Sequence, residues 1–222
     1  MKKMATAFLV FDIMAGLLFL GLCESRGQMV TVNGAAQEIR KVAITFDDGP
    51  HPSYTAQLLD GLKERGIHAT FFVTGEHAEA NPELIKRMWE EGHLIGNHTY
   101  SHIQLTERNR EMFREELVRT NEIIREITGE EVQYVRPPYG SWDKSFEKEL
   151  NMFPVLWNVD PLDWCSKNVA CITQKIVSKT GENDIILMHD YYETSVTAAL
   201  RAIDALQEEG YTFVTVEEIL FD

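Results

Sequence analysis

One stretch decides how the chain is organised, residues 42–50, which read Val42-Ala43-Ile44-Thr45-Phe46-Asp47-Asp48-Gly49-Pro50. Its apolar and β-branched first half is typical of a buried β-strand. Glycine and proline then end the strand, so Asp47 and Asp48 lie at its carboxyl end. Because side chains alternate along a strand, the two carboxylates are predicted to point in different directions. Each is therefore available for a separate task.

Length, composition and charge narrow the class of protein. The chain has 222 residues, enough for one α/β domain behind a short leader. A hydrophobic content of 44% and a charged content of 25% are typical of a globular protein. The formal net charge of −14 repels phosphate backbones, and the sequence has no basic patch with interleaved aromatic residues. These features argue against nucleic acid as a partner, and a neutral polymer such as a glycan suits the charge better.

The first residues are predicted to direct export. Residues 1–23 begin with two lysines and continue as an apolar run that only Asp12 interrupts. This run is longer than a usual signal-peptide core, so a cleaved signal peptide and a retained membrane anchor are both open interpretations. Residues 24–39 are predicted to be a tether and residues 40–222 a single domain. The domain is expected outside the cytoplasm, either secreted or held at the cell envelope.

From residue 40 onward, strand-like and helix-like segments alternate with short connections. The pattern predicts strands over residues 42–45, 69–73, 94–95, 134–136, 154–159, 184–188 and 212–214. It predicts helices over residues 53–65, 81–91, 106–128, 143–150, 171–179 and 195–209. About seven β/α repeats in one direction require a parallel sheet, and a barrel is the economical arrangement.

Two histidines downstream complement the aspartate pair. His98 and His102 are four residues apart, a spacing that places both imidazoles on one face of a helical turn. Together with Asp48 they make three protein ligands for zinc, which leaves one position open, as in catalytic zinc sites. The histidine spacing alone is a weak signal, because surface histidines meet it by chance. The aspartate pair upstream makes metal binding the stronger interpretation.

Three further segments lie at the ends of predicted strands, at residues 136–140, 160–164 and 187–189. Arg136 can hold a carboxylate through a bidentate contact, Trp164 can form the wall of a small pocket, and His189 is placed for acid–base chemistry. Each of these residues also has an ordinary structural explanation when taken alone. Their shared position carries the argument, because α/β barrels build their chemistry at the carboxyl ends of the strands.

The five segments resemble a known family. Residues 45–50, 98–102, 136–139, 160–164 and 187–189 look like the five ordered motifs of the NodB-type polysaccharide deacetylases, carbohydrate esterase family 4. The resemblance covers roughly residues 40 to 221. It implies a distorted (β/α) barrel of about seven strands and a metal-dependent hydrolase that removes acetyl groups from amino sugars. Zinc is the implied metal, with cobalt or another divalent transition metal as alternatives.

The resemblance also implies a role for each motif residue. Asp47 is the implied general base and His189 the general acid, while the implied metal ligands are Asp48, His98 and His102. Arg136 would orient the base and Asp163 would tune His189. The implied oxyanion and acetyl pocket consists of the Tyr139 backbone amide, Trp164 and Leu187.

Residues 157–164 and 187–190 look most like the bacterial peptidoglycan N-acetylglucosamine deacetylases, which implies cell-wall glycan as the substrate. Chitin oligomers, exopolysaccharide and acetyl-xylan stay open as alternatives. A glycoside hydrolase would use paired carboxylates without needing His98 and His102. A non-catalytic glycan-binding barrel would have lost a motif, and none is missing here. Protein partners and oligomeric state are left open.

Export also bears on the cysteines. Cys165 and Cys171 would lie in an oxidising compartment, where thiols pair readily. The sequence therefore predicts a disulfide between them, bracing the loop that follows Trp164, with two free thiols as the alternative in a reducing environment.

Overall fold

The computed structural model describes residues 40–221. The predicted leader (residues 1–23) and tether (residues 24–39) lie outside the described residues. Within residues 40–221, no helix is both long enough and apolar enough to cross a membrane.

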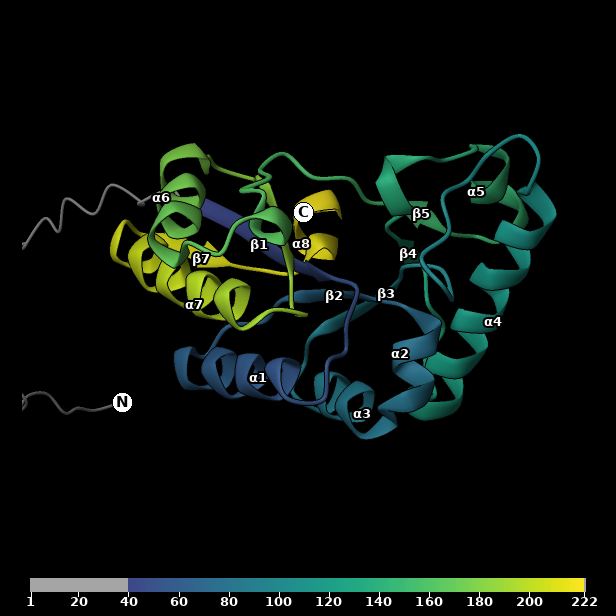
Figure 1. Ribbon diagram of the computed structural model, residues 1–222, viewed down its shortest axis with the longest axis horizontal. Helices are drawn as coiled ribbons and strands as arrows, with labels where there is room; N and C mark the ends of the chain where they lie inside the picture. The colour runs from purple at the N-terminus through teal and green to yellow at the C-terminus, as the bar shows by residue number, and fades with distance from the viewer. Residues whose placement is uncertain (1–39, 222) are drawn as a thin grey trace, which may run out of the picture. The chain divides into compact units, whose positions relative to one another are not determined.

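Seven parallel strands form the centre of the domain (Figure 1), in the order β5-β4-β3-β2-β1-β6, with β7 paired to the first residues of β1. They are β1 (Arg40–Asp47), β2 (Thr70–Val73), β3 (Leu94–Asn97), β4 (Tyr134–Val135), β5 (Phe153–Pro154), β6 (Ile185–His189) and β7 (Tyr211–Phe213). A single bridge from Val159 to Ile186 joins the chain after β5 to β6 and curls the sheet towards closure. The predicted distorted barrel of about seven strands is therefore confirmed as a curled half-barrel.

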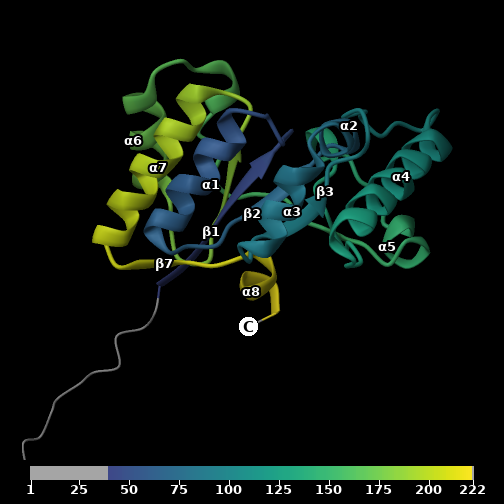
Figure 2. The ribbon, with the colours of Figure 1, turned by 90° about the horizontal axis from the view of Figure 1, so that it is seen from below.

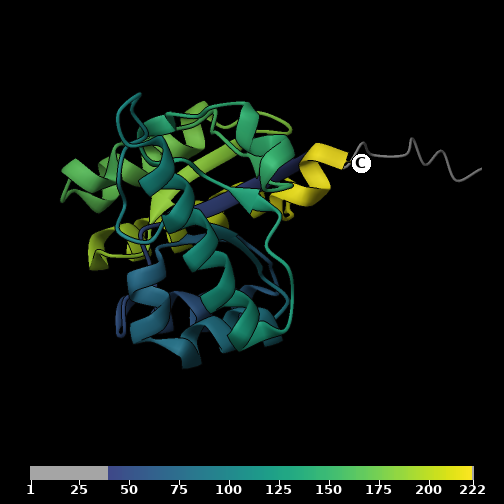
Figure 3. The same ribbon diagram turned by 90° about the vertical axis from the view of Figure 1, so that its right-hand side faces the viewer.

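Most of the helices pack on the outside of this curled sheet (Figures 1 and 2), whereas the last one, which begins at Val216, contributes that residue to the small apolar cluster inside the curl. The helices are α1 (Tyr54–Arg65), α2 (Gly75–Ala80), α3 (Pro82–Glu90), α4 (Arg110–Thr128), α5 (Ser145–Glu149), α6 (Val169–Lys179), α7 (Glu193–Glu208) and α8 (Val216–Phe221). On one side, α7 packs between α6 and α1, and on the other the long helix α4 packs against α2 and α3 (Figure 3). Helix α2 was not predicted, because six residues are too few to show a helical period.

One predicted strand is much shorter than expected. The prediction covered residues 154–159, whereas β5 ends at Pro154. The backbone carbonyls of Val155 and Leu156 accept hydrogen bonds from the Arg136 side chain, at 3.1 and 3.3 Å. These carbonyls therefore bond to a buried side chain inside the barrel instead of to a neighbouring strand, a contact that no local pattern in the sequence indicates.

Alternation along β1 sorts its side chains between two sides of the sheet. Even-numbered residues from 42 to 46 belong to the large apolar core shared with the helices, whereas Ala43 belongs to a small cluster inside the curl. Thr45 and Asp47 follow Ala43 at intervals of two and share its side. Both contact Arg136, which is fully buried inside the barrel. The alternation thus turns Asp47 inwards.

Candidate active site

The pairing of β1 with β6 places two predicted site residues side by side. In this parallel register Asp47 lies opposite His189, at the carboxyl ends of both strands. The local sequence places each residue at a strand end but does not show that they are neighbours, because they are separated by most of the domain. The register therefore brings a carboxylate and an imidazole to one edge of the sheet.

Arg136 anchors Asp47 from inside the barrel. Nη1 of Arg136 donates to Asp47 Oδ1 at 2.8 Å and also to the Thr45 hydroxyl. The other guanidinium nitrogens donate to the carbonyls of Val155 and Leu156. The bidentate contact suggested by the sequence is therefore wrong, because Nε and Nη2 of Arg136 donate to backbone carbonyls and only Nη1 donates to Asp47. The guanidinium is nevertheless held on all sides, so it fixes the orientation of Asp47.

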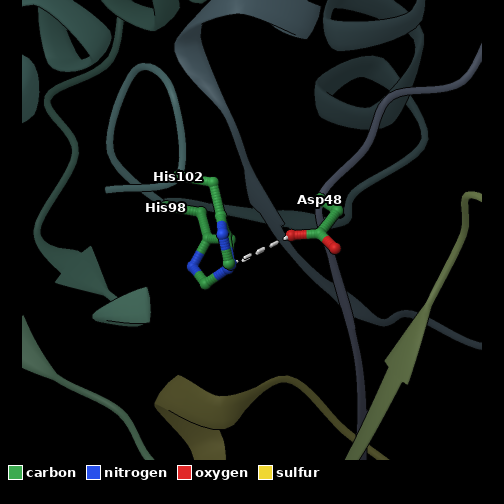
Figure 4. A group of neighbouring side chains, drawn as sticks. All are labelled: Asp48, His98 and His102. Atoms are coloured by element: carbon green, nitrogen blue, oxygen red, sulfur yellow. Dashed lines mark ion pairs between the residues drawn. The ribbon is translucent and has the colours of Figure 1, made fainter. Parts of the chain in front are cut away.

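Asp48, His98 and His102 form a group with the geometry of a metal site. Their ligand atoms all lie within 4.8 Å of one another. Figure 4 shows the Asp48 carboxylate directed at the two imidazoles, with Oδ1 at 3.4 Å from Nε2 of His98 and 3.5 Å from Nε2 of His102. This buried oxygen has no hydrogen-bond partner within the described residues. An unsatisfied carboxylate oxygen facing two imidazole nitrogens fits a divalent cation.

The histidine pair is not brought together by a helical turn, as the spacing suggested. Residues 98–102 form an irregular loop after β3 in which Thr99 and His102 have φ angles of 62° and 57°. Asp48 also has a positive φ, of 72°. Such left-handed conformations are unfavourable for residues other than glycine and are concentrated at functional sites. Left-handed backbone conformations at Asp48 and in the loop thus bring the three side chains together, at some cost in backbone strain.

Hydrogen bonds fix the direction of the ligand nitrogens. His98 Nδ1 lies 2.5 Å from the Arg136 carbonyl, so it carries the proton and leaves Nε2 free to face Asp48. Burial alone would raise the pKa of Asp48, but the attraction of the nearby His98, together with the charges of His189 and His102, outweighs it and lowers the pKa to about 2. Burial and the neighbouring His98 lower the pKa of His102. An ionised carboxylate and a neutral imidazole are the forms that bind metals.

Glu116 of α4 holds the loop that carries the two histidines. Its carboxylate accepts the backbone N–H groups of Tyr100 and Ser101, at 3.1 and 2.9 Å, and the Ser101 hydroxyl at 2.5 Å. Sequence analysis missed this residue, because nothing local distinguishes it from the other acidic residues of the helix.

Replacing Glu116 with Ala is expected to weaken the binding of a divalent metal ion at this group roughly tenfold, the lower end of the effect of residues that support metal ligands. Competition with a chromophoric chelator measures the affinity directly. Glu115, which is exposed on the same helix, provides the matched control Glu115→Ala. An unchanged affinity in Glu116→Ala would mean that the loop holds its own shape.

Asp163 lies directly beside His189. Its carboxylate accepts two hydrogen bonds of 2.9 Å, from Nδ1 and from the backbone N–H of His189. Burial lowers the pKa of His189, but the hydrogen bond and charge of Asp163, together with the charges of Asp47 and Asp48, raise it to about 9. Since Nδ1 is committed to Asp163, Nε2 faces the metal group, 4.0 Å from Asp48 Oδ2.

A cavity of about 370 Å³ unites the site. Eight of the ten predicted site residues line it, namely Asp47, Asp48, His98, His102, Tyr139, Trp164, Leu187 and His189. Arg136 and Asp163 lie behind this wall, each fixing a residue in front of it. Pro137, Trp157 and Asp160 complete the lining and were not assigned to the pocket from the sequence.

Tyr139 and Trp164 stand at the mouth of the cavity, with more than half of each side chain exposed, whereas Leu187 is buried at its wall. Tyr139 has a φ of 58°, another left-handed residue in this site. Its ring meets the His102 ring edge-on, with centroids 5.0 Å apart. The lining of the cavity therefore combines apolar and aromatic side chains with ionisable groups.

Asp190 is a further buried residue that the sequence analysis missed. It accepts a hydrogen bond from the Thr55 hydroxyl, while its other oxygen has no partner within the described residues. A Cβ atom added at Gly49 would lie 2.2 Å from this carboxylate. The close approach explains why glycine follows the aspartate pair.

The two cysteines are free thiols in the structure, so the predicted disulfide is wrong. Cys165 Sγ hydrogen-bonds to the Leu162 carbonyl at 3.3 Å. Cys171 lies in the first turn of α6, where its N–H is capped by the Asn168 side chain at 3.1 Å. The Cys165 thiol is therefore bonded to the backbone of its own turn and not to Cys171.

A curled parallel barrel with an Asp-His-His group and an opposed aspartate and histidine defines a class of metal-dependent hydrolases. The sequence profile described as polysaccharide deacetylase matches residues 34–155, and the chain belongs to the polysaccharide deacetylase family. The predicted family is thereby confirmed.

Among curated proteins, the chain is 40% identical over 178 residues to the peptidoglycan-N-acetylmuramic acid deacetylase PdaC of Bacillus subtilis. This alignment covers 80% of this chain and 38% of PdaC. It is 36% identical over 184 residues to the peptidoglycan-N-acetylglucosamine deacetylase PgdA of Listeria monocytogenes. This second alignment covers 83% of this chain and 40% of PgdA. The chain thus spans about two fifths of the length of these relatives. The solved structure of B. subtilis PdaC superimposes with a TM-score of 0.79 at 40% identity, covering 82% of this chain and 90% of that one.

Proposed function

We propose that this protein is a metal-dependent deacetylase of cell-wall peptidoglycan, which hydrolyses the N-acetyl group of N-acetylglucosamine units and releases acetate. The observation that carries the proposal is the Asp48, His98 and His102 group opposed by Asp47 and His189 across one cavity. Relatives named for peptidoglycan deacetylation support the substrate. An exported or envelope location, through the leader at residues 1–23, belongs to the same proposal.

The proposed metal ligands are Asp48, His98 and His102, and zinc is the proposed ion. Bound there, a zinc ion would polarise the acetyl carbonyl and lower the pKa of water from 15.7 to roughly 7. Three protein ligands leave room for water or substrate, which is typical of a catalytic rather than a structural site.

Asp47 and His189 divide the proton transfers of the proposed reaction. Asp47, oriented by Arg136, accepts the proton of water as the water oxygen bonds to the acetyl carbon. His189 donates its Nε2 proton to the amide nitrogen as the carbon–nitrogen bond breaks, while Asp163 keeps Nδ1 engaged. The products are acetate and a free amino sugar.

The remaining predicted residues shape the pocket. The backbone amide of Tyr139 is the proposed donor to the oxyanion, a role in which one well-placed N–H is worth roughly 10²–10³-fold in rate. Trp164 and Leu187 are the proposed walls around the acetyl methyl, and Trp157 joins them. An apolar wall opposite the charged groups orients the acetyl group for attack.

Acetate release from a panel of acetylated glycans tests the proposal. Peptidoglycan, chitin hexamer and acetyl-xylan are incubated with the protein, with and without added zinc, and the deacetylated sugar is identified by mass spectrometry. Deacetylated glucosamine from peptidoglycan is the expected product. Deacetylated muramic acid would move the site of action to the neighbouring sugar, which is the sugar named for PdaC. Absence of acetate from every glycan would contradict the proposed function.

A further inference from the structure

Five aromatic rings form a continuous cluster beside the candidate active site. His51 stacks on Tyr54 with centroids 4.4 Å apart and meets Tyr191 edge-on at 5.0 Å. Tyr191 also stacks on His77 at 5.3 Å and contacts Tyr192 at 5.9 Å. Tyr191 is thus the centre of the cluster, in contact with three other rings.

The cluster is joined to the metal group and lies at the same edge of the sheet. Its rings come from the segments that follow the carboxyl ends of β1, β2 and β6. His77 Nδ1 lies 2.7 Å from the backbone carbonyl of Asp48. Tyr139 belongs to the connection after β4, and Trp164 follows Asp163, which hydrogen-bonds to His189 at the end of β6. Aromatic side chains therefore reach this edge of the sheet from several of the connections that follow its strands.

Tyr191 and Tyr192 present much of their surface to solvent. Their side chains are 37% and 45% exposed, respectively. Within the described residues, neither phenol hydroxyl has a hydrogen-bond partner. A tyrosine usually buries its apolar ring and pairs its hydroxyl when its role is purely structural. Adjacent exposed aromatic rings at the edge of the sheet that carries the candidate site are instead typical of a ligand-binding surface.

We propose that Tyr191 and Tyr192 form a second sugar-binding subsite, which holds the pyranose ring adjoining the unit that is deacetylated. This inference rests on the proposed function. The C–H face of a pyranose carries a small positive charge and is attracted to the electron-rich face of an aromatic ring. The free phenol hydroxyls can bond to sugar hydroxyls. Because Tyr191 is already packed between its neighbours, little conformational freedom is lost on binding.

Binding of an oligosaccharide to the metal-free protein tests the subsite without turnover. Isothermal titration calorimetry measures the affinities of two probes, the chitin hexamer and the chitin disaccharide. They are measured for the wild-type protein and for the variants Tyr191→Ala, Tyr192→Ala and Tyr191→Phe. Each alanine variant is expected to weaken hexamer binding roughly tenfold relative to disaccharide binding, which is the effect of one aromatic contact of about 1.4 kcal/mol. Tyr191→Phe keeps the ring and should retain most of the affinity. In the metal-loaded enzyme the ratio of kcat/KM for hexamer to disaccharide should fall by the same factor.

Trp89→Ala is the matched control, because Trp89 is 43% exposed and lies in the last turn of α3, towards the opposite end of the barrel. Its hexamer affinity should equal that of the wild type. Equal affinities in all variants, or an equal loss for both probes, would overturn the subsite. Should Tyr191→Ala fail to fold, as judged by circular dichroism, the exposed Tyr192→Ala decides alone. Wild-type protein that binds hexamer through these tyrosines yet releases no acetate from any glycan would contradict the proposed function instead.

Discussion

Removal of the bound metal is expected to reduce acetate release to background while leaving the fold intact. The backbone around Asp48, His98 and His102 is held by protein contacts that need no ion, among them the His98–Arg136 and His77–Asp48 hydrogen bonds. Dialysis against a chelator, followed by activity assay and far-ultraviolet circular dichroism, measures both quantities. Zinc or cobalt should restore the activity.

Variants separate this effect from general damage. His102→Ala removes one ligand and is expected to lose zinc binding and activity together. His68→Ala removes an exposed histidine outside the metal group and should change neither. Full activity after rigorous metal removal would rule out the metal. Unfolding on chelation would instead assign the ion a structural role.

Replacing His189 with Ala is expected to lower kcat about 10²–10⁴-fold, the usual contribution of a general acid or base. The bound zinc should remain, because His189 is not among the proposed ligands. Parallel measurement of kcat and of metal content by atomic absorption tests both statements. Loss of zinc from His189→Ala would show that His189 serves the metal rather than the leaving amine.

The neighbouring carboxylate should control the pH at which this acid works. Since Asp163 raises the pKa of His189, the histidine stays protonated at neutral pH and activity falls as pH rises through that pKa. Asp163→Asn removes the negative charge with little change in shape, so the pKa of His189 falls and the alkaline limb of kcat moves to lower pH. An alkaline limb that stays in place would leave Asp163 a purely structural role.

Much of this protein could be predicted from its sequence because the signals are local. A β-branched run ended by Gly49-Pro50 identifies a strand end, and polar motifs after later strands share that edge in any parallel barrel. The order of strands and helices is likewise visible in hydrophobic periodicity. The candidate metal residues, together with Asp47 and His189, can therefore be identified from motifs, without knowledge of distances.

Only the tertiary structure decided how those residues meet. The β1–β6 register places Asp47 opposite His189. The buried Arg136 donates one hydrogen bond to Asp47 and others to backbone carbonyls. The loop at residues 98–102 turns through left-handed residues rather than a helical turn, and Glu116 from a distant helix holds it. The tyrosine cluster at Tyr191 also joins segments far apart in the chain. Such contacts depend on long-range packing, which periodicity and spacing within one segment do not encode.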